Sequence, residues 1–128
     1  MISIAEAQQI HQILIDLFGG SHGIRDIKAL DAALKRPMAT FSGEELYTTI
    51  VDKAAATLES ITKNHPFIDG NKRTAYVLMR LFLLREGFDI DASEQEKYQL
   101  VMEVSQGRHS IEDIRNWIAL RLIKMEDS

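Results

Sequence analysis

The chain has 128 residues, with 19 acidic and 15 basic side chains, a net charge of −4 and no cysteine. This length suits a single domain over residues 1–128, and the lack of cysteine excludes a disulfide framework, a thiolate nucleophile and a cysteine-based zinc site. The acidic balance argues against direct binding to nucleic acid, and the sequence has neither a signal-peptide pattern nor a membrane-spanning run. We therefore expect a cytoplasmic protein with no membrane partner.

The first third of the chain predicts two helices. Ser3-Ile4-Ala5-Glu6 is a capping-box pattern, and Gly19-Gly20 ends the segment that it opens. The predicted apolar face of this first helix consists of Ile10, Ile13, Leu14, Leu17 and Phe18. Asp26 is expected to cap a short second helix, which Pro37 closes.

The middle of the chain predicts two longer helices. A second capping-box pattern, Ser42-Gly43-Glu44-Glu45, indicates a third helix that runs to about Asn64. Its predicted core residues are Leu46, Ile50, Ala54, Leu58 and Ile61. From Thr74 to Leu84 nearly every residue is apolar, which is typical of a helix buried in the middle of a domain, and Gly87 is a natural C-terminal stop.

The last third of the chain completes an all-α pattern. Phe88–Asp91 reads as a short extended connector, after which Ser93 and Ser110 are expected to cap a fifth and a sixth helix. The predicted apolar residues of the sixth helix are Ile111, Ile114, Ile118 and Leu122. Strand-like alternation is nearly absent from the chain, so the sequence predicts a compact six-helix fold.

The most informative segment is residues 65–74, His-Pro-Phe-Ile-Asp-Gly-Asn-Lys-Arg-Thr. It lies at the start of the buried fourth helix, where unpaired backbone N–H groups and the helix dipole favour an anion. His65 can accept a hydroxyl proton at neutral pH and is the predicted general base. Asp69 offers the hard oxygen ligand that Mg²⁺ prefers, although it could also serve only as a helix N-cap.

The remaining polar residues of this segment suit a nucleotide phosphate. Asn71 can donate to phosphate oxygens, and Lys72 and Arg73 can neutralise the charge of a transition state. Gly70 permits a close approach of the backbone, whereas Phe67 is expected to anchor the segment to the core. We therefore predict a site for a nucleotide phosphate and Mg²⁺.

Several familiar sites do not fit this segment. The Gly-x-x-x-x-Gly-Lys-Ser/Thr pattern of P-loop proteins and the His-Arg-Asp pattern of ordinary protein kinases are absent from the sequence. A calcium loop that begins at Asp69 would place Arg73 and Arg80 at ligand positions, and one that begins at Asp89 would place Leu100 there. The four histidines are too scattered for a zinc hydrolase.

Residues 65–73 do match the signature His-x-Phe-x-Asp/Glu-Gly/Ala-Asn-Gly/Lys-Arg, so the chain resembles the Fic/Doc family. Residues 23–26, 30–34, 36–37 and Phe41 also look like sequence of the Doc (death on curing) branch. The resemblance implies a six-helix Fic-type core and the toxin half of a toxin–antitoxin pair. It also implies an ATP-dependent kinase that phosphorylates a threonine of elongation factor Tu and arrests translation.

Two positions separate this chain from the adenylyltransferases that it resembles. Lys72 stands where Fic-type enzymes usually carry Gly, and Tyr76 stands where they carry a second Arg. Doc-like proteins share both features, and the resemblance implies that they bind ATP reversed, with the γ-phosphate at the target hydroxyl. A Fic-type AMP transfer and a catalytically idle helical binding module are the alternatives.

Other features of the sequence are given less specific roles. His11, His22 and His109 are expected at the surface, and the methionines and Trp117 are expected to be packing groups. Residues 36–41 could form an inter-helix loop or the target-docking flap of the family. The family's inhibitory pattern, Ser/Thr-x-x-x-Glu-Gly/Asn, is absent from the sequence. We therefore expect restraint by a small antitoxin in trans.

Overall fold

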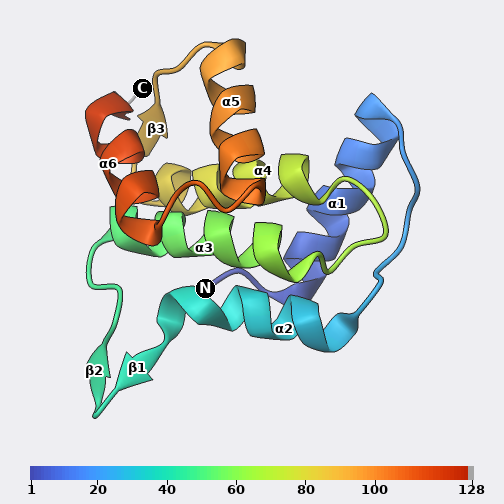
Figure 1. Ribbon diagram of the computed structural model, residues 1–128, viewed down its shortest axis with the longest axis horizontal. Coiled ribbons are helices and arrows are strands. Elements are labelled where there is room, and N and C mark those ends of the chain that lie inside the picture. Colours follow the sequence, from blue (N-terminus) through green and yellow to red (C-terminus); the bar gives the residue numbers. More distant parts are fainter. Residues whose placement is uncertain (127–128) are drawn as a thin grey trace.

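The computed structural model describes residues 1–126 and confirms the all-α prediction (Figure 1). The six α-helices are α1 (Ile4–Phe18), α2 (Ile27–Lys35), α3 (Ile50–Asn64), α4 (Asn71–Arg85), α5 (Glu94–Ser105) and α6 (Ile111–Arg121). A 3₁₀ turn, η1 (Arg36–Met38), extends α2. The strands are β1 (Thr40–Phe41), β2 (Glu44–Glu45), β3 (Phe88–Ile90) and β4 (Leu122–Lys124). Within the described residues, every helix is too short or too polar to cross a membrane.

Helices α3 and α4 form the centre of the fold, and the other helices pack around them (Figure 1). Helix α4 is buried along most of its length, as its apolar sequence predicts, and Leu78, Met79 and Leu83 are fully buried. Helix α3 packs against it, and the alanines of α3 at positions 54, 55 and 56 are buried and have short side chains that let the neighbouring helices approach closely. Truncating Leu78 to Ala should cost about 2–5 kcal/mol of stability because of the cavity that it would leave.

The buried face of α1 differs from the predicted one. Ala7, His11 and Ile15 point into the protein, whereas Ile13, Leu17 and Phe18 are exposed. The prediction that His11 lies at the surface is therefore wrong. The apolar pattern was misleading because α1 has apolar residues on two sides, and the side with a histidine packs beneath the loop that follows α3.

The start of α3 was also predicted incorrectly. Residues 42–45 do not open a helix. Instead they complete an antiparallel hairpin, in which β1 pairs with β2 and the turn has positive φ angles at Ser42 and Gly43. Thr49 and Asp52 form the true capping box, and Leu46 is exposed rather than in the core. The predicted end at Asn64 is confirmed, and the hairpin projects from the helical body (Figure 1).

The C-terminal part of the fold contains a strand that the helical pattern concealed. Leu122, predicted as the last apolar residue of the sixth helix, begins β4, which pairs antiparallel with β3. Trp117 packs against the core as expected. Met79 is also a packing residue, but Met1, Met38 and Met125 are exposed, so the prediction for the methionines holds only in part. His22 is exposed as predicted, and His109 is half-buried.

Candidate active site

The predicted site lies in the loop that joins α3 to α4, residues 65–70, which we call the motif loop. His65 ends α3 in the left-handed region, with φ 45° and ψ 56°, and Gly70 precedes α4 with φ 73°. Left-handed backbone is uncommon for side chains other than Gly, although Asn, Asp and His adopt it more readily than most. The chain thus reverses between two buried helices through two residues that suit this conformation, and His65 is left exposed.

Residues 23–26 hold one edge of the motif loop through the backbone. The amide of Ile68 donates to the carbonyl of Gly23 at 3.1 Å, and the amides of Arg25 and Asp26 both donate to the carbonyl of Pro66, at 2.8 and 3.1 Å. Ile24 and Phe67 form an antiparallel bridge. The segment that follows α1 therefore aligns the loop as a neighbouring strand would.

Arg25 is a site residue to which the sequence analysis gave no role. Its guanidinium donates to two consecutive carbonyls, with Nε 2.6 Å from the oxygen of His65 and Nη2 2.7 Å from the oxygen of Asn64. These carbonyls lie at the C-terminal end of α3, where a helix lacks intrahelical donors and attracts cations. Arg25 thus fixes the backbone that presents the His65 imidazole.

Asn71 fixes the motif loop from inside. Its side-chain oxygen accepts from the amide of Phe67, and its side-chain nitrogen donates to the carbonyl of Phe67, both at 2.9 Å. The amide group of Asn71 has a second N–H, which leaves one donor for the phosphate contact that the sequence predicted. Phe67 is 1% exposed, which confirms its predicted role as the anchor of the loop.

The carboxylate of Asp69 is held in one orientation by two backbone donors. Oδ1 accepts from the amide of Gly70 at 2.8 Å, and Oδ2 accepts from the amide of Ser21 at 3.1 Å. The Ser21 and Gly70 amides lower the pKa of Asp69, so its side chain is ionised at neutral pH. Gly70, not Asp69, is the N-cap of α4. An exposed, ionised and oriented carboxylate is the donor chemistry that a Mg²⁺ ion needs, so Asp69 fits the predicted metal role.

The turn after α1 leaves no space for a larger residue beside Asp69. A Cβ atom on Gly20 would lie 2.7 Å from Oδ2 of Asp69, and Gly20 has φ 115°, a conformation that side chains rarely adopt. Glycine at this position therefore lets the turn come close enough for Ser21 to donate to the carboxylate.

The two predicted phosphate-binding cations occupy the first turn of α4, and both are exposed. The Arg73 guanidinium lies over the ring of Phe18, with its carbon 4.4 Å from the ring centroid. Among residues 1–126, Lys72 makes no ion pair. Both side chains are therefore available to a negatively charged ligand.

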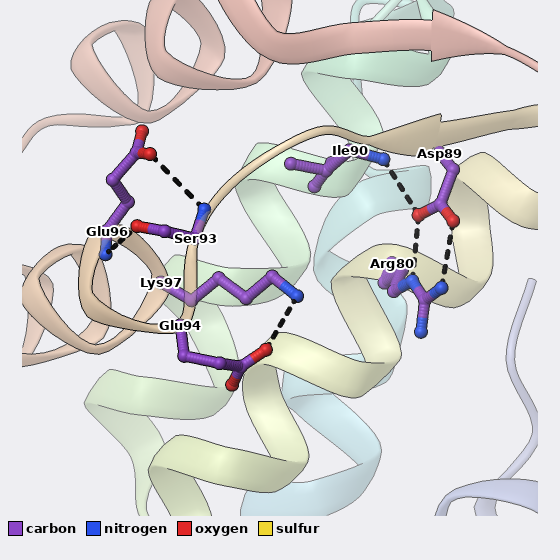
Figure 2. Close-up of polar contacts among 7 residues, drawn as sticks. All are labelled: Arg80, Asp89, Ile90, Ser93, Glu94, Glu96 and Lys97. Carbon is purple, nitrogen blue, oxygen red and sulfur yellow. Dashed lines mark hydrogen bonds and ion pairs between the residues drawn. The ribbon is translucent and has the colours of Figure 1, made fainter.

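Beside these cations a cleft of about 500 Å³ runs between α1, α4 and α5. It is lined by Leu14, Phe18, Lys72, Arg73, Tyr76, Val77, Arg80, Glu94, Lys97, Tyr98, Val101 and Met102. Most of the lining residues are apolar, and the charged ones are four cations and Glu94. Figure 2 shows part of this lining, where Arg80 makes two bonds to Asp89 and Lys97 pairs with Glu94.

Tyr76 closes the inner side of this cleft. Its side chain is buried, its hydroxyl has no hydrogen-bond partner within residues 1–126, and burial raises its pKa to about 12. Tyr76 is therefore neutral, and it supplies none of the charge that a second Arg of the motif would bring to a phosphate.

Comparisons with known proteins identify the family of the chain. The sequence profile described as the Fic/DOC family matches residues 1–83. A protein named "Toxin Doc", from Mycolicibacterium smegmatis (strain ATCC 700084 / mc(2)155), is 46% identical over 83 residues, which cover 60% of this chain and 64% of that protein. The "Protein kinase doc" of Escherichia phage P1 is 31% identical over 113 residues, which cover 88% of each chain. The chain belongs to the Fic/DOC family.

Proposed function

We propose that this chain is a Doc-type toxin that acts as an ATP- and Mg²⁺-dependent protein kinase and transfers the γ-phosphate to a threonine of elongation factor Tu. The observation that carries the proposal is the motif loop, in which an exposed His65 and an oriented, ionised Asp69 precede a helix whose first turn presents Lys72 and Arg73. The phage relative is named a protein kinase, and the mycobacterial relative is named a toxin.

In the proposed reaction the threonine oxygen forms a bond to the γ-phosphorus while the bond between that phosphorus and the β,γ-bridging oxygen breaks, which releases ADP. The threonine proton passes to the imidazole of His65, because the hydroxyl becomes a better nucleophile as it loses that proton. Lys72 and Arg73 neutralise charge on the transferred group. Mg²⁺ bound by Asp69 would supply further neutralisation of the phosphates.

Lys72 and Tyr76 support γ-phosphate transfer over AMP transfer. Lys72 adds bulk and charge where an adenylyltransferase has Gly, and the buried, neutral Tyr76 replaces its second phosphate-binding Arg. The decisive experiment incubates purified protein and elongation factor Tu with ATP that is labelled at either the α or the γ position. Label should enter the target from the γ position only, and mass spectrometry showing added AMP would overturn the kinase assignment.

The β1–β2 hairpin is the proposed contact for the protein target. Its Phe41 is 73% exposed, and Met38 and Leu46 beside it are also exposed, so the hairpin offers apolar side chains that a partner can cover. Phe41→Ser should raise KM for elongation factor Tu without destabilising the fold, and KM for ATP should stay unchanged. An equal rise in both constants would show that the hairpin has no selective part in target binding.

We further propose that a small antitoxin blocks this toxin in trans by folding an acidic amphipathic helix into the cleft between α1, α4 and α5. The apolar walls suit one face of such a helix, and Lys72 and Arg73, which make no ion pair within residues 1–126, suit its acidic side chains. Coexpression with the neighbouring reading frame should yield a copurifying complex and restore growth. Tyr98, which is 67% exposed in the cleft, provides the test variant Tyr98→Glu, because the new charge would repel the helix.

Leu120 provides the matched control, because it is 83% exposed and lies outside the cleft. Leu120→Glu should leave the complex intact while Tyr98→Glu weakens it. Equal binding by both variants would place the antitoxin elsewhere. If the wild-type chain is harmless alone, forms no complex and leaves elongation factor Tu unmodified, the idle binding module replaces the toxin proposal.

A further inference from the structure

His11 is the one histidine in residues 1–126 that is fully buried, with only 1% of its surface exposed. It lies outside the signature sequence, on the inner face of α1, yet it contacts the motif loop at two points. Its ring stacks on the ring of Phe67, with centroids 4.0 Å apart and planes 4° from parallel. Its Nε2 lies 2.7 Å from the backbone oxygen of Asp69.

The second contact fixes the tautomer of the imidazole. A carbonyl oxygen only accepts hydrogen bonds, so Nε2 of His11 must carry a proton and donate it to Asp69. The stacked Phe67 ring and the Asp69 carbonyl lie two residues apart in the loop. The imidazole therefore fixes both the position of the Phe67 ring and the direction of the peptide group between Asp69 and Gly70.

That peptide group is the one that orients the Asp69 carboxylate. The carbonyl of Asp69 and the amide of Gly70 belong to the same rigid plane, and the amide of Gly70 donates to Oδ1 of Asp69. A rotation of this plane would remove the donor from the carboxylate. Glycine at position 70 permits such a rotation more readily than any other residue, so the plane needs an external hydrogen bond to stay in place.

Helix α1 and its C-terminal turn thus reach Asp69 twice. His11 holds the backbone carbonyl, and Ser21 donates to Oδ2 of the side chain. The space around Gly70 is correspondingly tight, because a Cβ atom there would lie 3.1 Å from Cδ1 of Ile15 and 3.7 Å from Nε2 of His11.

We propose that His11 is a positioning residue that sets the orientation of the Asp69 carboxylate through the peptide between Asp69 and Gly70. The expected effect on catalysis rests on the proposed function, but the orientation of Asp69 by His11 does not depend on which reaction the site performs. His11 is buried and reaches the motif loop through Phe67 and Asp69, so it positions the site and is not itself a catalytic residue.

Two substitutions separate the hydrogen bond from the packing. His11→Phe keeps a flat ring against Phe67 but removes the donor, whereas His11→Gln removes the ring but places an amide N–H near the position of Nε2. We expect His11→Phe to lower kcat for phosphate transfer by about tenfold to a hundredfold with KM for the protein target nearly unchanged, because a small misplacement of a catalytic group has an effect of this size. His11→Gln should recover most of that loss.

Amide exchange and NMR shifts provide a readout that does not need activity. In His11→Phe the Gly70 and Ser21 amides should shift and should exchange at least about tenfold faster than in the wild type, and in His11→Gln they should remain close to the wild type. Circular dichroism should show that both variants keep their helical content. Wild-type loop exchange in His11→Phe, or equal kcat losses in both variants, would overturn the positioning role.

A measurement on the unaltered protein covers the case in which a variant does not fold. Long-range ¹H–¹⁵N spectra should show His11 protonated at Nε2, with a coupling across the hydrogen bond to the Asp69 carbonyl. Protonation at Nδ1 alone would contradict the inference. If the wild-type chain transfers no phosphate but shows this tautomer and coupling, the proposed function fails while the positioning of Asp69 stands.

Discussion

The two ends of α4 differ in their charges and their capping: those at the C-terminal end stabilise the helix, and those at the N-terminal end do not. At its C-terminal end the last turn carries Arg85, which pairs with Glu6 of α1, and Gly87 follows in the left-handed region. A basic last turn and a following glycine are the features that stabilise a helix end. At its N-terminal end Gly70 provides no side-chain cap, and the first turn carries Lys72 and Arg73, whose charges oppose the helix dipole.

The other helices show that this N-terminal end is unusual within the chain. Helices α1, α3, α5 and α6 each begin with a complete capping box, and Asp26 caps α2. Among the α-helices of residues 1–126, only α4 begins without a side-chain hydrogen bond to its first amides. The donors that a cap would occupy stay available to an anion, and the two cations gain a partner when that anion arrives. The N-terminal end of α4 is therefore less stable than a capped helix start, and it is the place where the ligand is expected to bind.

The largest expected effect comes from His65, the residue on which the proposed chemistry depends. His65→Ala should lower transfer by about a thousandfold, because a positioned general base contributes about 10²–10⁴ in rate. The fold should remain, since the side chain is exposed. The measurement is steady-state transfer to elongation factor Tu, with thermal unfolding in parallel.

Two further variants sharpen this test. His65→Asn also removes the base, but Asn tolerates the left-handed backbone found at position 65, so it separates chemistry from loop conformation. His22→Ala is the matched control, because His22 is an exposed histidine outside the motif loop. Full activity in a folded His65→Asn protein would place the base elsewhere.

The next largest effect compares substitutions at the two ends of α4, Lys72→Ala and Arg85→Ala. Lys72→Ala should lower transfer by about tenfold to a hundredfold, yet it should raise stability by about 0.3–1 kcal/mol because it removes a cation from the positive end of the helix. Arg85→Ala should do the opposite for stability, since Arg85 favours the dipole and pairs with Glu6. Urea unfolding of the two variants checks both signs. A loss of stability in Lys72→Ala would refute the view that the ligand end is locally unfavourable.

Ligand binding should then stabilise the N-terminal end. ATP with Mg²⁺, at about 100 times its Kd, should raise the unfolding free energy by about 2.7 kcal/mol. Adenosine should raise it far less, because it lacks the phosphates that the first turn of α4 would bind. Asp69→Asn should reduce the stabilisation by ATP with Mg²⁺ more than it reduces the stabilisation by ATP without the metal. Thermal unfolding at matched ligand concentrations tests this, and equal stabilisation by adenosine and ATP would contradict it.

The sequence predicted these two ends unequally well. The C-terminal end follows from Gly87 and the apolar run before it, since both are local signals. The N-terminal end was recognised from the polar residues 65–74 at a helix start and from the motif of fixed letters, which together indicated His65 and Asp69. The residues that hold the loop, His11, Ser21 and Arg25, lie 40 or more positions away in the chain. No local periodicity records such contacts, because they depend on how α1 packs beneath the loop.

The errors in the helix boundaries occur where strand pairing replaces a predicted helical segment. A capping-box pattern at residues 42–45 obeys a local rule, but the hairpin and the positive φ angles at Ser42 and Gly43 override it. Leu122 continues the helical spacing of α6, yet its backbone pairs with Ile90 instead. Five of the six helix starts were predicted because a capping side chain or the motif precedes them. The β3–β4 pair joins segments that are distant in the chain and leaves no comparable local signal.

The smallest expected effect lies toward the C-terminal end of α4, where Arg80 makes a bidentate contact with Asp89 of β3, with both bonds at 2.8 Å (Figure 2). Asp89→Asn should lower the unfolding free energy by about 1 kcal/mol or less at pH 7, because the pair is partly exposed and solvent screens it. The hydrogen bond from Arg80 is the main cause that lowers the pKa of Asp89 below its ordinary value of 3.8.

Because the folded state lowers the pKa of Asp89, the stabilisation is fully present above pH 3.8 and is lost as the pH falls through the lowered value in the folded protein. Urea unfolding from pH 7 to pH 2 should therefore show a difference between wild type and Asp89→Asn that is constant near neutrality and narrows in acid. Asp91→Asn is the matched control, because Asp91 is an exposed aspartate beyond β3, whereas the carboxylate bonded to Arg80 is that of Asp89. A gap between wild type and Asp89→Asn that widens in acid would mean that this pair does not stabilise that end of α4.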